Sequence, residues 1–222
     1  PIITINAAET FTISNGTAAD NFVYNTSTNA LTIGDGTNGL TFDIDTGMTY
    51  QGTGRPLVKN ILSAEYPGAV LFADGTTNTG SMTSDYTNAQ ATGSRQTYYE
   101  WNSTTASPLQ DYDIVVRFTL PSDFGVWETG VDQAIIFNYV TEDASSANNQ
   151  IDATVRLSTL DTADATEVDR VSTTWATGAI DDSELTDCDA AGETCVIEFK
   201  MQSMNNFFTR VGDIQLQYRA KF

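Results

Sequence analysis

The chain has 222 residues, 40% of them hydrophobic, which is enough to bury a substantial core. With 10 Lys and Arg against 29 Asp and Glu, its net charge of −19 repels nucleic-acid phosphates and anionic membrane surfaces, so neither is an expected partner. The absence of His excludes Ser-His and Cys-His catalytic pairs and most zinc and iron sites.

Residues 1–47 predict a run of short strands. Apolar pairs recur about every ten residues, separated by Asn-Gly and Asp-Gly dipeptides that are typical of tight turns. Each strand has too few apolar residues to form a core alone, so this connector segment is expected to pack on the rest of its chain or on a neighbouring subunit. Strand donation to a neighbour is one alternative, and its interacting side chains would be Ile3, Ile5, Phe11 and Ile13.

Residues 48–222 predict an all-β domain, an antiparallel, jelly-roll-like β-sandwich. Alternating or continuous apolar residues predict strands near 66–75, 97–101, 112–120, 134–140, 151–158, 194–201 and 213–222. In the last of these, Ile214, Leu216 and Tyr218 are expected in the core. The segment 181–191 is polar and can hold one helical turn.

The two cysteines, Cys188 and Cys195, lie close together in "TDCDAAGETCVIEF". We predict that they form a disulfide that closes a small loop just before a strand. A disulfide indicates an oxidising compartment. The alternative is a pair of buried free thiols.

Asp43 and Asp45 in "DIDTG" have the i, i+2 spacing found in calcium-binding loops. Ca²⁺ at this turn is one interpretation, and solvated turn carboxylates are the other. The further acceptors and the terminal Glu of an EF-hand are missing. No other cofactor is expected.

Two carboxylates have aromatic neighbours, as a glycosidase site requires: Glu100 beside Trp101 and Glu128 beside Trp127. We expect both to be ordinary strand or loop residues, and the protein not to be an enzyme. A sugar-stacking face is an alternative role for the aromatic residues, which otherwise belong to the core. Its candidates are Tyr98, Tyr99, Trp101, Trp127 and Trp175.

The order "TFDIDTGMTYQGTGRPLVKNILSAEYPGAVLFADGTTNTGSMTSDY", "YYEW", "LQDYDIVVRFTLPSDF" and "GDIQLQY" resembles β-sandwich domains of an uncharacterised family. Those domains end long, repetitive cell-surface or phage-fibre-like proteins of uncultivated bacteria. The segment "TFTISNGTAADNFVYNTSTNALTIG" resembles the short β repeats that precede such ends. The resemblance implies an extracellular structural or adhesive module, and it brings no catalytic motif or site residue.

The expected function is therefore that of a non-enzymatic extracellular structural protein, a subunit of a self-assembling surface filament, sheath or fibre. The alternative is a glycan- or receptor-binding adhesion or fibre-tip module. Expected partners are copies of the same chain or a glycan, with no membrane span. Because the chain begins "PIITINAAETFTIS", without an initiator Met or a basic region, we expect it to be a piece of a longer precursor.

Overall fold

The computed structural model describes residues 10–13, 21–34, 38–45, 47–51, 55–73, 76–87, 96–129, 134–160 and 162–221. Contacts divide the chain into two compact units. The first consists of Pro1–Val58, Asp123–Val126 and Tyr218–Phe222, and the second of Lys59–Ser122 and Trp127–Gln217. The first unit thus contains more of the chain than the predicted segment 1–47.

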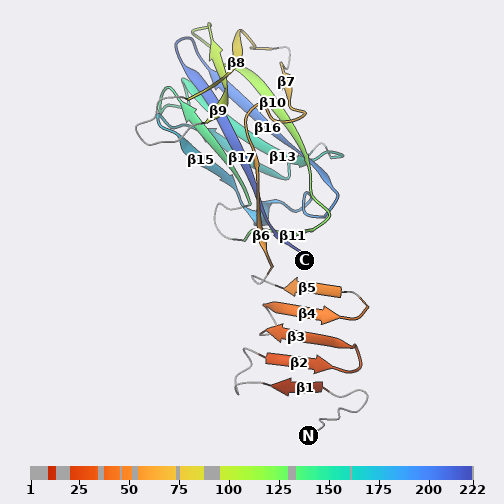
Figure 1. Cartoon of the computed structure of the whole chain (residues 1–222). Coiled ribbons are helices and arrows are strands. Elements are labelled where there is room, and N and C mark those ends of the chain that lie inside the picture. Colours follow the sequence, from red (N-terminus) through yellow and green to blue (C-terminus); the bar gives the residue numbers. More distant parts are fainter. Residues whose placement is uncertain are drawn as a thin grey trace. The chain divides into compact units, whose positions relative to one another are not determined.

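The first unit contains a five-stranded antiparallel sheet, here called the meander sheet, whose strands pair in chain order (Figure 1). Its strands are β1 (Thr10–Ile13), β2 (Asn21–Asn25), β3 (Ala30–Gly34), β4 (Gly39–Asp43) and β5 (Gly47–Gln51). Strands β1 to β4 lie within the predicted run of short strands, whereas β5 was not predicted.

The turn chemistry of the meander sheet explains its tight hairpins. Between β4 and β5, an Asp43 carboxylate oxygen accepts a hydrogen bond from the backbone N–H of Asp45 at 2.9 Å, and Gly47 has a φ of +84° that favours glycine. Between β3 and β4, a Cβ atom at Gly39 would lie 2.5 Å from the carbonyl oxygen of Ile33. Glycine is therefore required where these two strands meet.

A β-sandwich of two antiparallel sheets accounts for most of the second unit, which confirms the predicted fold class (Figure 1). One sheet, here sheet I, has the order β14-β13-β16-β10-β7 and the other, sheet II, the order β15-β12-β17-β9-β8, with β6 and β11 also paired to β17. Sheet I consists of β7 (Val70–Phe72), β10 (Gln110–Thr119), β13 (Asn149–Leu157), β14 (Ala165–Arg170) and β16 (Thr194–Ser203). Sheet II and its additions consist of β6 (Leu57–Leu62), β8 (Gly80–Tyr86), β9 (Thr97–Ser103), β11 (Phe124–Trp127), β12 (Ile135–Thr141), β15 (Ala176–Ile180) and β17 (Phe208–Ala220).

The core lies between the two sheets of the sandwich. Phe137 of sheet II meets Phe199 of sheet I edge to face, with ring centroids 5.2 Å apart, and Trp101 meets Tyr112 at 5.4 Å. Gly178 lies directly behind the Phe137 ring, where a Cβ atom would collide with it. Fully enclosed side chains from both sheets surround these rings: Ile114, Ile135, Ile151, Val155, Ile180, Cys195, Ile197, Met201, Val211 and Ile214.

Strand β17, which covers most of the predicted strand 213–222, lies inside sheet II, between β12 and β9. Ile214, Leu216 and Tyr218 are all buried. The predicted helical turn is present as a short 3-10 helix at Asp182–Glu184. At the edge of sheet I, the largely polar residues 165–170 form β14, because edge pairing with β13 makes a strand without needing a buried apolar face.

Candidate functional site

The outer face of sheet II carries aromatic side chains around an ion pair. On β9, Trp101 is buried in the core, and strand alternation places Tyr98 and Glu100 on the opposite, outer side. On β17, Thr209 and Val211 are fully buried. Their neighbours Phe208 and Arg210 therefore share the outer side with Tyr98 and Glu100.

The cross-strand register brings these outer residues together, since Arg210 lies opposite Glu100. Arg210 Nε donates to Glu100 Oε2 at 2.6 Å. The guanidinium carbon lies 4.8 Å from the centre of the Tyr98 ring and 3.9 Å from that of Phe208, within the range of cation–π attraction. Trp175, just before β15, meets Tyr98 with ring centroids 5.8 Å apart. These five residues form what we call the aromatic platform.

A glycine lets Trp175 lie close to the sheet. A Cβ atom at Gly212 would be 3.3 Å from the Trp175 ring and 2.5 Å from the side-chain oxygen of Gln96. That Gln96 oxygen is buried and accepts no hydrogen bond from any described residue. A buried acceptor without a described partner thus lies beside the indole ring.

A cavity of about 220 Å³, here called the tyrosine pocket, adjoins the platform at Tyr98. Its lining residues are Glu65, Ser84, Asp85, Tyr86, Thr97 and Tyr98. Tyr86 is 51% exposed, and Ser84 Oγ donates to Glu65 Oε1 at 2.7 Å. The pocket therefore combines an accessible ring with carboxylate acceptors.

The Tyr98 phenol is neutral at pH 7, as tyrosines ordinarily are, and its surroundings shift its pKa further upward. Burial raises its pKa, Asp85 and Glu100 add to the rise, and Arg210 opposes it. The hydroxyl group thus stays a hydrogen-bond donor at neutral pH. Platform and pocket together combine aromatic rings, guanidinium and phenol donors, and carboxylate acceptors, which is the mixture that neutral polyhydroxy compounds require.

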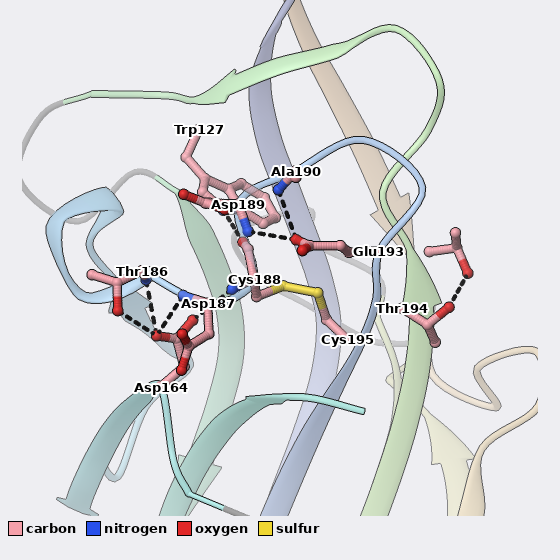
Figure 2. The surroundings of a disulfide bond; sticks show 11 residues. Trp127, Asp164, Thr186, Asp187, Cys188, Asp189, Ala190, Glu193, Thr194 and Cys195 are labelled. Atoms are coloured by element: carbon pink, nitrogen blue, oxygen red, sulfur yellow. Dashed lines mark hydrogen bonds between the residues drawn. A yellow bond between two sulfur atoms is a disulfide. The ribbon is translucent and has the colours of Figure 1, made fainter. Parts of the chain in front are cut away.

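The predicted disulfide between Cys188 and Cys195 is present, with Cα atoms 6.1 Å apart and both residues fully buried (Figure 2). Hydrogen bonds brace the loop that it closes. Asp164 accepts from the backbone of Thr186, Asp187 and Cys188 at 2.9–3.0 Å. Glu193 accepts from the backbone N–H of Asp189 and Ala190 at 3.0 and 2.7 Å.

The structure separates the predicted aromatic residues into two groups. Tyr98, itself only 6% exposed, and the partly exposed Trp175 meet on the outer face of sheet II, whereas Trp101 and Trp127, 1% and 3% exposed, belong to the core. The Trp101 indole N–H donates to the carbonyl oxygen of Gln110, and that of Trp127 donates to Cys188, so both are structural. Tyr99 belongs to neither group, because its ring packs against the ring of Tyr66, with centroids 5.7 Å apart.

The two candidate catalytic carboxylates have different surroundings. Glu100 is bound to Arg210, and Glu128 is buried at 7% exposure beside Trp127. Asp43, one of the candidate calcium ligands, closes the β4–β5 turn through the Asp45 N–H. Within the part of the chain that the structure describes, no three His, Cys, Asp or Glu side chains gather as a metal site. Calcium binding stays a prediction.

Only two of the four residues predicted to take part in strand donation are among the described residues. Ile3 and Ile5 lie outside the described residues, whereas Phe11 and Ile13 belong to β1, which pairs with β2 of the same chain. Strand donation to a neighbour stays a prediction. No helix in the described ranges is long and apolar enough to cross a membrane.

Sequence reasoning missed Glu65, Asp85, Tyr86, Phe208 and Arg210. They are dispersed along the chain. Strand register unites the four that lie on β8 and β17, as in the pairs Asp85–Tyr98 and Arg210–Glu100, and Glu65 joins from the bend after β6 by accepting a hydrogen bond from Ser84. One signal was available: Phe208 and Arg210 both sit at outward positions of the final strand, two residues apart.

No family model matches the chain, and no curated protein matches it. Among solved structures, TmCBM61 in complex with β-1,4-galactotriose is 10% identical, with 72% of this chain and 88% of that chain covered and a TM-score of 0.36. Caldicellulosiruptor saccharolyticus CBM27-1 in complex with mannohexaose is 10% identical, with 72% and 96% covered and a TM-score of 0.37. A carbohydrate-binding module of the β-sandwich superfamily, described for promiscuous specificity, is 9% identical, with 90% and 77% covered and a TM-score of 0.37. At these scores the likeness defines neither the family nor the ligand of this chain.

Proposed function

We propose that this protein is a non-enzymatic extracellular module that binds neutral glycans on the outer face of sheet II. The observation that carries the proposal is the Arg210–Glu100 ion pair held between the rings of Tyr98 and Phe208, beside Trp175. The arrangement is fixed before any ligand arrives, because each polar side chain already has a bonded or stacked partner. Preorganisation of this kind lowers the entropy cost of binding.

Charge favours a neutral ligand. The chain carries a net charge of −19, and Asp85 and Glu65 line the tyrosine pocket. Uronic acids, sulfated sugars and phosphates would be repelled, whereas the hydroxyl groups of neutral hexoses can donate to the carboxylates. Ring faces supply the apolar contact for the C–H face of a sugar.

The disulfide supports an extracellular location, since such bonds persist in oxidising compartments. An adhesive end module of a surface protein, as the sequence resemblance implies, would fit this location. The predicted filament, sheath or fibre function gains no support from the platform and stays a prediction.

The test is a glycan array of neutral hexose oligosaccharides, followed by calorimetry with the best binder. Replacing Trp175 with Ala should weaken binding at least about tenfold, which corresponds to ~1.4 kcal/mol. Arg210→Gln should weaken it similarly. Arg156→Gln is the matched control, because Arg156 pairs with Glu198 on sheet I at similar exposure and should leave binding unchanged.

Tryptophan fluorescence gives an independent readout. Of the three tryptophans, Trp101 and Trp127 are buried, and only Trp175 is partly exposed. A bound sugar should therefore change the emission of the native protein and leave that of a Trp175→Phe variant unchanged. Absence of binding to every neutral glycan, or full binding by both Trp175→Ala and Arg210→Gln, would refute the proposal.

A further inference from the structure

The meander sheet has one fully apolar face. Cross-strand register aligns two rows of side chains on that face, and each row takes one residue from each of β2, β3, β4 and β5. The first row is Phe22, Ile33, Leu40 and Tyr50, and the second is Tyr24, Leu31, Phe42 and Met48. All eight are apolar or aromatic, so this apolar face has no polar position in its two rows.

The opposite face of the same sheet is different. Its central row is Val23, Thr32, Thr41 and Thr49, and the hydroxyl groups of Thr32 and Thr41 are hydrogen-bonded at 3.1 Å. This row suits contact with water. This contrast is typical of an antiparallel sheet that has one face packed against a second layer and the other face in water.

The apolar face is open. Phe22, Ile33, Phe42 and Met48 are 38–44% exposed, and Ile44, at the end of β4, is 77% exposed. Taking about 200 Å² for a fully exposed large side chain, these five residues offer on the order of 500 Å². A hollow of about 410 Å³ lies on the second row. Its lining residues are Tyr24, Asn29, Leu31, Phe42, Asp43, Ile44, Gly47 and Met48.

We propose that this apolar face packs against the same face of a second copy of the chain. An amphipathic sheet is stable when a second layer covers its apolar side, and the five strands of the meander sheet form a single layer. Two copies of the meander sheet would provide two layers at the usual spacing of about 10 Å, with the side chains interdigitated.

The apolar area that two such faces would bury is large enough for a specific protein–protein interface. Two faces together remove on the order of 1,000 Å² from water, which is where specific interfaces begin. The stretch of exposed apolar surface is also at the upper end of what monomers show.

The charge distribution also favours a second copy of the chain as the partner of this face. Two chains of net charge −19 repel each other over most of their surface, and the eight positions of the apolar face are uncharged. This face is therefore where two copies can approach at the smallest electrostatic cost. Because the remaining repulsion is screened by salt, association should strengthen as the salt concentration rises from 50 to about 500 mM.

Analytical ultracentrifugation of the full chain tests the proposal. The native protein should be a dimer at micromolar concentration, and Phe42→Asp should shift it to monomer with at least a tenfold increase in the dissociation constant. Thr41→Asp is the matched control, since Thr41 is the adjacent residue on the polar face, and it should remain dimeric. A monomer at every concentration and salt would overturn the proposal, as would an unchanged dimer in Phe42→Asp.

A cross-linking experiment covers the case in which Phe42→Asp fails to fold. Both native cysteines are in the disulfide, so an introduced cysteine is the sole free thiol. Ile33→Cys, near the middle of the apolar face, should give a covalent dimer under mild oxidation, and Thr32→Cys on the polar face should not. Cross-linking by Thr32→Cys alone, or a native assembly of more than two copies, would contradict the face-to-face pair.

Discussion

The meander sheet and the sandwich are made of strands with the same apolar alternation, yet they differ in what the apolar residues touch. In the sandwich, Phe199 is fully buried and meets Phe137 of the facing sheet. In the meander sheet, Phe42 lies at an equivalent kind of position and stays 43% exposed. Apolar alternation therefore shows which face of a strand is apolar. How much those apolar residues stabilise the fold depends on whether a second layer covers them, and the sequence pattern does not reveal that layer.

The largest expected effect comes from removing residues 217–222. Gln217 donates its N–H to Ala134 and accepts from Glu128 through its carbonyl oxygen, and Tyr218 packs on Phe124 with centroids 5.4 Å apart. Loss of these contacts should leave the chain without a cooperative thermal transition or near-ultraviolet circular dichroism. Deleting residues 1–14, which removes only β1 of the meander sheet, should preserve both. A folded chain without 217–222 would show that the end of β17 is dispensable.

The second prediction compares the two phenylalanines directly. Phe199→Ala should lower the free energy of unfolding by about 3–5 kcal/mol, because it leaves a cavity in a closed core. Phe42→Ala should cost about 1 kcal/mol or less at concentrations where the chain is monomeric, because less apolar area is lost from contact. Urea denaturation measures both. Equal costs would mean that the apolar face is covered after all.

Removing the disulfide should have an intermediate effect on the free energy of unfolding, and this effect should be confined to the sandwich. Replacing both Cys188 and Cys195 with Ala should lower the free energy of unfolding by about 2–3 kcal/mol, the value for closing so short a loop. The native protein should show no reactive thiol when unfolded without reductant. Labelling of two thiols per chain would disprove the bond, and an unchanged midpoint in the double variant would show that the Asp164 and Glu193 hydrogen bonds hold the loop alone.

The smallest effect concerns pH. Burial raises the pKa of Asp152 on β13, helped by the charge of Asp169 and opposed by hydrogen bonds to the Asp169 N–H and Gln202 and by Lys200. Because the folded pKa is above the unfolded one, the folded state binds the proton more tightly, and this group's contribution to stability is lost as pH rises from the unfolded pKa through the folded pKa.

Asp152→Asn removes that titration, so its melting temperature relative to the native protein should increase between pH 4 and pH 7. The gain at pH 7 should be small, roughly 0.5 kcal/mol or less. Asn keeps an acceptor for the Asp169 N–H. A variant that becomes relatively less stable with rising pH would show that the hydrogen bonds outweigh burial.

The sequence predicted the central strands well, because burial on one side leaves a pattern. Cys195, Ile197, Phe199 and Met201 all point into the core, as their spacing indicated. Edge strands were harder to predict from the sequence. In β14, Val168 and Asp169 are both exposed, so the strand exists through backbone pairing with β13, which leaves no trace in the apolar pattern.

The candidate site was less predictable than the fold. Tyr98 and Trp175 were among the expected aromatic residues, but nothing in their spacing separates them from the buried Trp101 and Trp127. Arg210 and Glu100 are 110 residues apart, and their meeting depends on the register of β17 against β9. Register follows from the whole sheet, so a site assembled across strands cannot be derived from any one segment.

The position of β17 also bears on how fast each region forms. In the meander sheet, every strand pairs with its neighbour in sequence, so closing each hairpin needs only a short loop, and formation within microseconds is expected. Sheet II cannot close until β17 finds β12 and β9 across long stretches of chain, a non-local search typical of folding in milliseconds to seconds. During that interval the apolar face of the meander sheet is already displayed, so encounters between chains can begin before the sandwich is complete.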